Sequence, residues 1–118
     1  MKILIAGDLF VSDQYYTNHI IDKSVHDLFI TADYRIVNLE APITDDIPEN
    51  RIIKTGPHLR MSEQTSLSIL KQLNVDGVTL ANNHILDYGT KGLLDTLDTL
   101  KKNDITYVGA GVNLKDAA

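Results

Sequence analysis

The sequence contains no cysteine, no excess of basic residues and no long apolar run. The lack of cysteine excludes disulfide bonds and thiolate ligands, so a metal ion would have to be bound by oxygen and imidazole groups. A net charge of -5 without a basic cluster argues against nucleic acid as a partner. An anionic substrate would therefore need a local positive centre, which a metal ion provides most simply.

The lack of a long apolar run bears on membrane association. The amino-terminal run, residues 3–6, stops at Gly7-Asp8 and is too short for a signal-peptide core or a membrane span. We therefore expect a soluble, cytoplasmic protein, with association with the cell envelope as the alternative. A chain of 118 residues is one domain at most and can bury only about two-thirds of its unfolded surface.

Hydrophobic patterning predicts strands that alternate with helices. Short apolar runs predict a first strand that is buried on both faces and three further strands, over residues 3–6, 35–39, 77–81 and 105–108. Apolar stripes at helical spacing predict helices over residues 24–30, 62–73 and 90–102. Residues 44–60 have turn chemistry without a period, which is typical of a functional loop. This alternation predicts an α/β fold, with a mainly parallel sheet of about four strands and crossover helices.

Polar side chains stand where the predicted strands end. Asp8 follows the first strand, Asn38 and Glu40 lie at the end of the second, and Asn-Asn-His at residues 82–84 follows the third. Parallel strands point their carboxyl ends to one side, which is where open α/β sheets bind ligands. We therefore expect these polar residues to share one rim of the sheet.

Each rim residue taken alone has an ordinary structural explanation. Asp8 can simply form a turn, and Glu40 can be an exposed loop residue. Asn82 and Asn83 can satisfy the backbone of a tight turn through their side chains. His84 can be a hydrogen-bonded structural histidine. Only the combination of these residues at one rim points to a ligand site.

The combination matches the ligand set of a divalent metal. Asp8, Glu40, Asn83 and His84 offer the oxygen and nitrogen donors that bind Mn²⁺, Zn²⁺ or Fe. A carboxylate shared by two such ions would hold them about 3.5–4 Å apart, the spacing used for phosphoryl hydrolysis. Asp87 could orient the imidazole. Four protein groups are few for two ions, so either the site is mononuclear or further ligands lie elsewhere.

Two other segments carry weaker signals. Lys54, His58 and Arg60 in the long loop could contact an anion, although a solvated loop is the simpler interpretation. The glycines at 109 and 111 could let the backbone approach a phosphate, but two spaced glycines are a weak signal without the rest of a dinucleotide motif.

Several short motifs occur in order along nearly the whole chain: Gly7-Asp8, Asn38-Leu39-Glu40, Leu80-Ala81-Asn82-Asn83-His84 with Asp87-Tyr88-Gly89, and Tyr107-Val108-Gly109-Ala110-Gly111 with Asn113. This series resembles the CapA family of bacterial capsule-synthesis or poly-gamma-glutamate-synthesis proteins. Ala-Asn-Asn-His with Asp-Tyr-Gly is a specific match, whereas Gly-Asp alone is not. The resemblance implies a domain similar to the calcineurin-like metallophosphoesterases.

The resemblance also implies roles for individual residues. Asp8 would be a first metal ligand, Glu40 would occupy the place of the metal-bridging acid, and Asn83 would bind a second metal. His84 would contact the phosphate and serve as the catalytic acid. Behind these groups, or in contact with the substrate, would stand three further residues: Asn38, Asn82 and Asp87.

Two departures from the metallophosphoesterase pattern concern the completeness of the site. Phe10 stands two residues after the first Asp, where those enzymes usually carry a His. The chain also ends before any segment like the Gly-His-x-His run that supplies their further histidines. We therefore expect residues 1–118 to be the truncated amino-terminal half of such a domain, with an incomplete site and little turnover. An exposed sheet edge would favour a homo-oligomer.

Three functions remain as hypotheses at this point. The first is a CapA-like, metal-dependent phosphoesterase that serves capsule or poly-gamma-glutamate synthesis, with a phosphoester or anionic polymer as its substrate. The alternative is a non-catalytic module that binds an anionic polymer or a partner protein. The third is a nucleotide-binding α/β module, which nucleotides would stabilise thermally without added metal.

Overall fold

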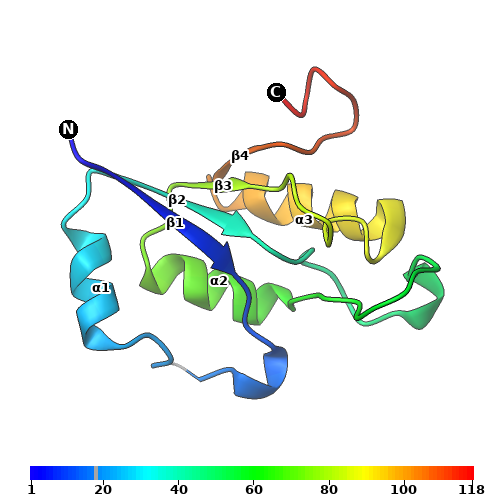
Figure 1. The fold of residues 1–118 in the computed structure, drawn as a ribbon, viewed down its shortest axis with the longest axis horizontal. Coiled ribbons are helices and arrows are strands. Elements are labelled where there is room, and N and C mark those ends of the chain that lie inside the picture. The colour runs from blue at the N-terminus through cyan, green and yellow to red at the C-terminus, as the bar shows by residue number, and fades with distance from the viewer. Residues whose placement is uncertain (18) are drawn as a thin grey trace.

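The structure is a computed structural model that describes residues 1–17 and 19–118. Its four strands form one parallel sheet in the order β1-β2-β3-β4; their bounds are Ile3–Leu9, Tyr34–Leu39, Gly77–Thr79 and Thr106–Val108. The crossovers between them contain α1 (Lys23–Ile30), α2 (Glu63–Gln72) and α3 (Gly89–Lys102) (Figure 1). Two short 3-10 helices are η1 (Asp13–Tyr15) and η2 (Pro48–Asn50). The predicted α/β fold with four parallel strands is confirmed.

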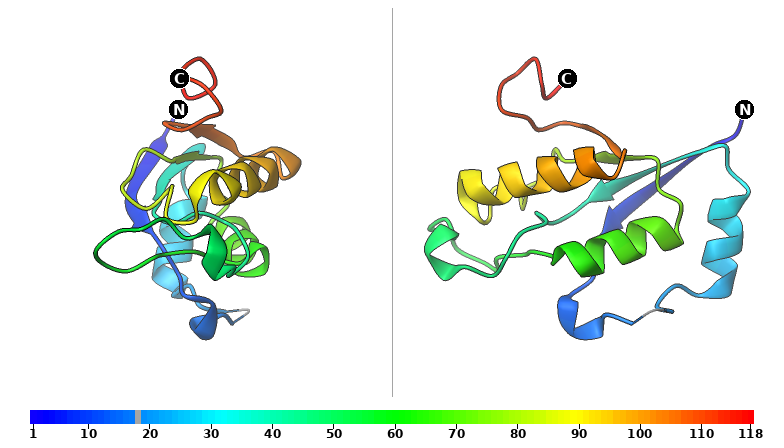
Figure 2. Two further views of the ribbon diagram at one scale, coloured as in Figure 1. Left: turned by 90° about the vertical axis from the view of Figure 1, so that its right-hand side faces the viewer. Right: turned by 180° about the vertical axis from the view of Figure 1, so that it is seen from behind.

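All three helices cover the same face of the sheet. The strands follow one another in space as they do in sequence, and right-handed crossovers then always pass over the same side. Figure 2 (left) looks nearly along the strands and shows the helices gathered on one side. The core lies between this side of the sheet and the helices, and its least exposed members are Val37, Leu39, Val78, Leu80, Ile69, Leu70 and Leu100.

The opposite face of the sheet is open at β1. Leu4 and Ala6 pack against the core, whereas Ile3 is 50% exposed and Ile5 is 76% exposed. The prediction that this strand is buried on both faces is therefore wrong. β1 is an edge strand, and among the described residues no helix covers its outer side.

The first strand is also longer than the sequence predicts. It continues through Gly7 and Asp8 to Leu9, with an irregular register between Ile5 and Asp8. Asp8 pairs with Asn38 of β2, so it lies within the strand and not in a turn after it. This pairing brings the first two predicted rim residues side by side.

The ends of the helices follow from local capping. The Ser62 side chain accepts a hydrogen bond of 3.1 Å from the Thr65 N–H and caps α2. At α1 the cap is Asp22, whose carboxylate accepts from the Ser24 N–H at 2.8 Å. None of the helices in the described ranges combines the length and apolarity needed to cross a bilayer.

The tail after β4 forms turns that fold back on the strand end. The Gly109 N–H donates to the Ala117 carbonyl at 2.8 Å, and residues 114–117 form turns. Gly109 has a φ of +92°, and a Cβ there would lie 2.8 Å from the Ala81 nitrogen. A glycine is therefore required where this tail passes the end of β3.

Candidate functional site

The Asn38 side chain lies at the centre of the candidate site. Its Nδ2 donates to Asp8 Oδ1 at 2.7 Å and to Glu40 Oε2 at 2.5 Å. The two carboxylate oxygens therefore lie within about 5 Å of each other, since they share one donor. Parallel pairing of β1 with β2 produces this convergence, because Asp8 and Asn38 are register partners.

The other end of the Asn38 amide connects the acids to the turn after β3. Asn38 Oδ1 accepts from Thr79 Oγ1 at 3.1 Å and from Asn82 Nδ2 at 3.2 Å. Asn82 also donates to the Leu39 carbonyl at 2.8 Å and accepts the His84 N–H at 3.0 Å. Hydrogen bonds thus run from Asp8 across β2 to the His84 turn.

This hydrogen-bonded group opens onto the face of the sheet that no described helix covers. Register and alternation place Asn38 and Thr79 on the outer face, on the same side as Ile36. At β1 the outer face carries exposed Ile5 toward the amino end of the strand and exposed Asp8 toward the carboxyl end. The face is therefore apolar at one end and polar at the other, and the candidate site is the polar end.

His84 is held by a neighbouring carboxylate. Its Nδ1 lies 2.7 Å from Asp87 Oδ2, and its side chain is only 13% exposed. An ionised carboxylate can only accept, so Nδ1 of a neutral ring must carry the proton. Nε2 is then left with a free lone pair, and it becomes a donor only when the ring is protonated.

Asp87 is the fully buried anchor of the site. Its carboxylate accepts from the Lys54 ammonium, from the Leu59 N–H at 2.7 Å and from His84. Burial by itself would raise the pKa of Asp87, but these three hydrogen bonds outweigh it and lower the pKa below 3.8. The ionised carboxylate therefore ties the long loop to the histidine. The Ile52 N–H, which donates to the Asp87 carbonyl at 3.0 Å, adds a further tie.

The structure does not unite all the predicted site residues. Asp8, Asn38, Glu40 and Asn82 form one hydrogen-bonded group, and Asp87 holds His84. Asn83 is exposed, and its side chain makes no hydrogen bond within residues 1–17 and 19–118.

Sequence reasoning missed two contacts of the site. Lys54 is 20% exposed and pairs with Asp87, so its assignment to a solvated loop is wrong. Thr79 was not singled out, because a threonine in a strand carries no functional signal. Lys54 was considered only as a weak signal for anion contact, and its pairing with Asp87 was missed, since the loop has no period from which the direction of its side chains could be inferred.

The donor chemistry of the site fits a hard divalent cation only in part. Two carboxylates converge on the two N–H bonds of the Asn38 amide group, which occupies a place where positive charge is favoured. Over the described ranges, however, no three Asp, Glu or His side chains come together closely enough to bind an ion. The carboxylates provide two ligands, and a complete coordination sphere needs more.

Comparison with known proteins identifies the relatives of the chain. The family model for bacterial capsule synthesis protein PGA_cap matches residues 2–118. Capsule biosynthesis protein CapA of Bacillus anthracis is 34% identical over an alignment of 124 positions, gaps included, that covers 98% of this chain and 30% of that protein. PGA biosynthesis protein CapA of Bacillus subtilis is 37% identical over 93 residues, or 79% of this chain and 24% of that protein.

A further relative comes from Mycobacterium tuberculosis. This probable polyglutamine synthesis accessory protein is 37% identical over 83 residues, or 70% of this chain and 21% of that protein. The chain therefore spans less than a third of the length of the curated relatives that it matches.

Proposed function

The chain belongs to the family of bacterial capsule synthesis proteins PGA_cap, and on this premise we propose that it serves capsule or poly-gamma-glutamate synthesis through a phosphoesterase-type metal centre. The observation that supports this proposal most directly is the shared hydrogen bonding of Asp8 and Glu40 to Asn38. Asp8 of β1 and Glu40, which directly follows β2, are held together at the end of a parallel sheet, where such folds bind ligands.

In this proposal Asp8 and Glu40 bind a divalent ion such as Mn²⁺, Zn²⁺ or Fe, and the exposed Asn83 amide adds an oxygen. A bound ion would supply a Lewis acid for the phosphoester and lower the pKa of a water molecule. The Asp87 carboxylate keeps the proton of a neutral His84 ring on Nδ1. The lone pair on Nε2 is then available for proton transfer. Within residues 1–17 and 19–118 two carboxylates converge here, so water molecules or further protein groups would complete the coordination sphere.

Calorimetric titration with Mn²⁺ and Zn²⁺ tests the metal part of the proposal. We expect the wild-type chain to bind, and the Asp8→Asn and Glu40→Gln variants to bind at least about tenfold more weakly, because each loses a charged ligand. Asp98→Asn is the control, since Asp98 is an exposed acid on α3 that forms an ion pair with Lys102 at the surface. Equal binding by all four chains would contradict the proposal.

Hydrolysis of a model phosphoester in the presence of the bound metal tests the chemical part. His84→Ala should reduce turnover further than it reduces metal affinity, because His84 would act on the phosphoester. Metal binding without any hydrolysis, with or without His84, would leave only the non-catalytic alternative.

That alternative is a module that binds an anionic polymer without cleaving it. The observation that favours it is the absence, over the described ranges, of a third acid or imidazole in the metal site. The binding-module alternative predicts that polyglutamate binds the metal-free chain. The phosphoesterase proposal predicts that His84→Ala affects phosphoester turnover only when a metal is bound.

A further inference from the structure

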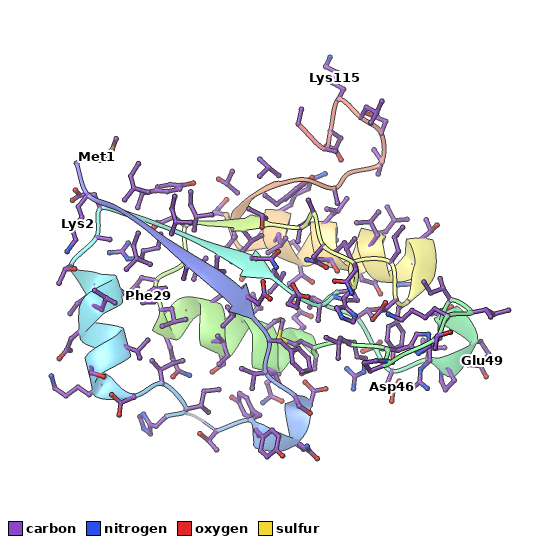
Figure 3. All side chains as sticks on the ribbon, viewed as in Figure 1. Met1, Lys2, Phe29, Asp46, Glu49 and Lys115 are labelled. Carbon is purple, nitrogen blue, oxygen red and sulfur yellow. The ribbon has the colours of Figure 1, made fainter. Side chains whose placement is uncertain are left out.

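A second polar pocket lies next to the candidate site. It has a volume of about 330 Å³ and is lined by the segment that follows β1, by the long loop and by Tyr88; its polar members include Arg51, His58 and Arg60. Tyr88 comes directly after Asp87, and Phe10 and Ser12 come shortly after Asp8, so the pocket shares two chain segments with the site. Asp46, which also lines it, lies in the loop at the end of the molecule far from Met1 (Figure 3).

One oxygen of Asp46 occupies the point where the donors of the pocket converge. Asp46 Oδ1 lies 2.7 Å from Arg51 Nη2, 2.8 Å from the Tyr88 hydroxyl and 3.8 Å from Arg60 Nε. The hydrogen bonds from Arg51 and Tyr88 keep the pKa of Asp46 below its ordinary value. Guanidinium and phenol groups in this arrangement are a recognition set for a carboxylate or a phosphate.

The donors are held in place by contacts other than Asp46. Tyr88 is only 2% exposed, and its hydroxyl also accepts from Arg51 Nε at 3.1 Å. Arg60 is bound by Asp13 at 2.8 Å and donates to the Thr44 carbonyl at 3.1 Å. Asp46 itself has a side chain that is 48% exposed and belongs to a surface loop. The donor groups of Arg51, Arg60 and Tyr88 therefore stay in position when the Asp46 side chain moves away.

The charge of the pocket changes when Asp46 leaves. Arg51 and Arg60 are balanced by Asp13 and Asp46 as long as both acids are in place. Without Asp46 the pocket has one unbalanced positive charge and an open point of convergence. An oxyanion of similar size can then take the same hydrogen bonds.

We propose that this pocket is a subsite for a carboxylate or phosphate group of an anionic ligand, and that Asp46 is the internal ligand which this group displaces. The inference rests on the proposed function and deepens it, because the pocket shares the segments around Asp8 and Asp87 with the rim, and a polymer bound at the rim carries further acidic groups. The binding of an oxyanion needs no metal and is tested separately.

The test is NMR titration of the metal-free 118-residue chain with glutarate and, in a second series, with inorganic phosphate. We expect Asp46→Ala to bind one of these anions about tenfold more tightly than wild type, with shifts at the Nε–H groups of Arg51 and Arg60. The series with the stronger binding identifies the chemical source of the oxyanion. Asp45→Ala, which changes the adjacent exposed acid, should bind as wild type does.

Two further variants keep the test decisive. Adding Arg51→Gln to Asp46→Ala should abolish the gain in affinity. Asp46→Asn, which has the same shape, replaces Asp46→Ala if the alanine chain does not fold. The proposal is overturned if neither Asp46 variant gains affinity over wild type, or if the shifts fall outside the pocket. Either result would have no bearing on the conclusion drawn from the metal titration of the Asp8 and Glu40 variants.

Discussion

At the scale of single residues, Asp87 is the side chain whose replacement should reduce the free energy of unfolding the most. It is fully buried, and it receives the Lys54 ammonium, the Leu59 N–H and the His84 imidazole. Asp87→Asn leaves the 20% exposed ammonium without its partner, and breaking a buried pair in this way costs about 3–5 kcal/mol. Urea unfolding at pH 7 measures this loss. Asp98→Asn is the matched control, because its exposed pair with Lys102 should contribute less than about 1 kcal/mol.

The lowered pKa of Asp87 predicts how that loss depends on pH. A carboxyl group whose pKa is lower in the folded than in the unfolded state stabilises the fold above its ordinary value of 3.8. This contribution disappears as the pH falls through the lower folded value. The difference in unfolding free energy between wild type and Asp87→Asn should therefore shrink below about pH 4. A difference that is the same at pH 7 and pH 3 would refute the assignment.

Single residues of the site were predictable to different degrees from the sequence. The meeting of Asp8, Asn38 and Glu40 follows from parallel strands that end at one rim, and the structure shows their hydrogen bonds. The pairing of Lys54 with Asp87 depends on how an irregular loop folds back, and neither hydrophobic period nor turn chemistry encodes that path. Loops without a period carry little information about the direction of their side chains.

At the scale of elements, α2 offers a test of local encoding. Ser62 caps its first turn by accepting from the Thr65 N–H at 3.1 Å. Ser62→Ala should cost about 1 kcal/mol of unfolding free energy, because one backbone N–H loses its partner. Ser62→Asn should retain most of the stability, since Asn caps equally well. Thermal unfolding of both variants decides whether the cap or another property of Ser62 matters.

β1 shows the limit of prediction at the same scale. A continuous apolar run correctly predicts a strand, but the run does not say where the strand lies in the sheet. The structure places β1 at an edge, with Ile3 and Ile5 on an open face. The order of the strands in the sheet depends on how the crossover helices pack. The apolar pattern of a single strand does not indicate its place in that order. The same reason explains why an edge strand was mistaken for a central one.

At the scale of the whole molecule, the one-sided sheet predicts self-association. Ile3 and Ile5 are exposed beside half-buried Tyr34 and Ile36, and soluble monomers rarely expose a contiguous apolar patch larger than a few hundred Å². Ile5→Lys should leave the unfolding free energy within about 0.5 kcal/mol of wild type while it reduces oligomer formation. Leu39→Ala, on the covered face, should instead cost about 2–5 kcal/mol. Sedimentation velocity and urea unfolding together separate these effects, and a wild-type chain that stays monomeric at high concentration would contradict the prediction.

The polar end of that same face carries the main functional claim, which is that acids from two strands and the turn after β3 form one metal-binding rim. Paramagnetic broadening of amide and side-chain NMR signals by substoichiometric Mn²⁺ tests this claim most directly. We predict that Asp8, Asn38, Glu40 and the Asn83-His84 turn broaden first and together, and that Asp8→Asn greatly weakens the effect. Broadening that begins at other acidic residues, or that leaves either Asp8 or Glu40 unaffected, would contradict it.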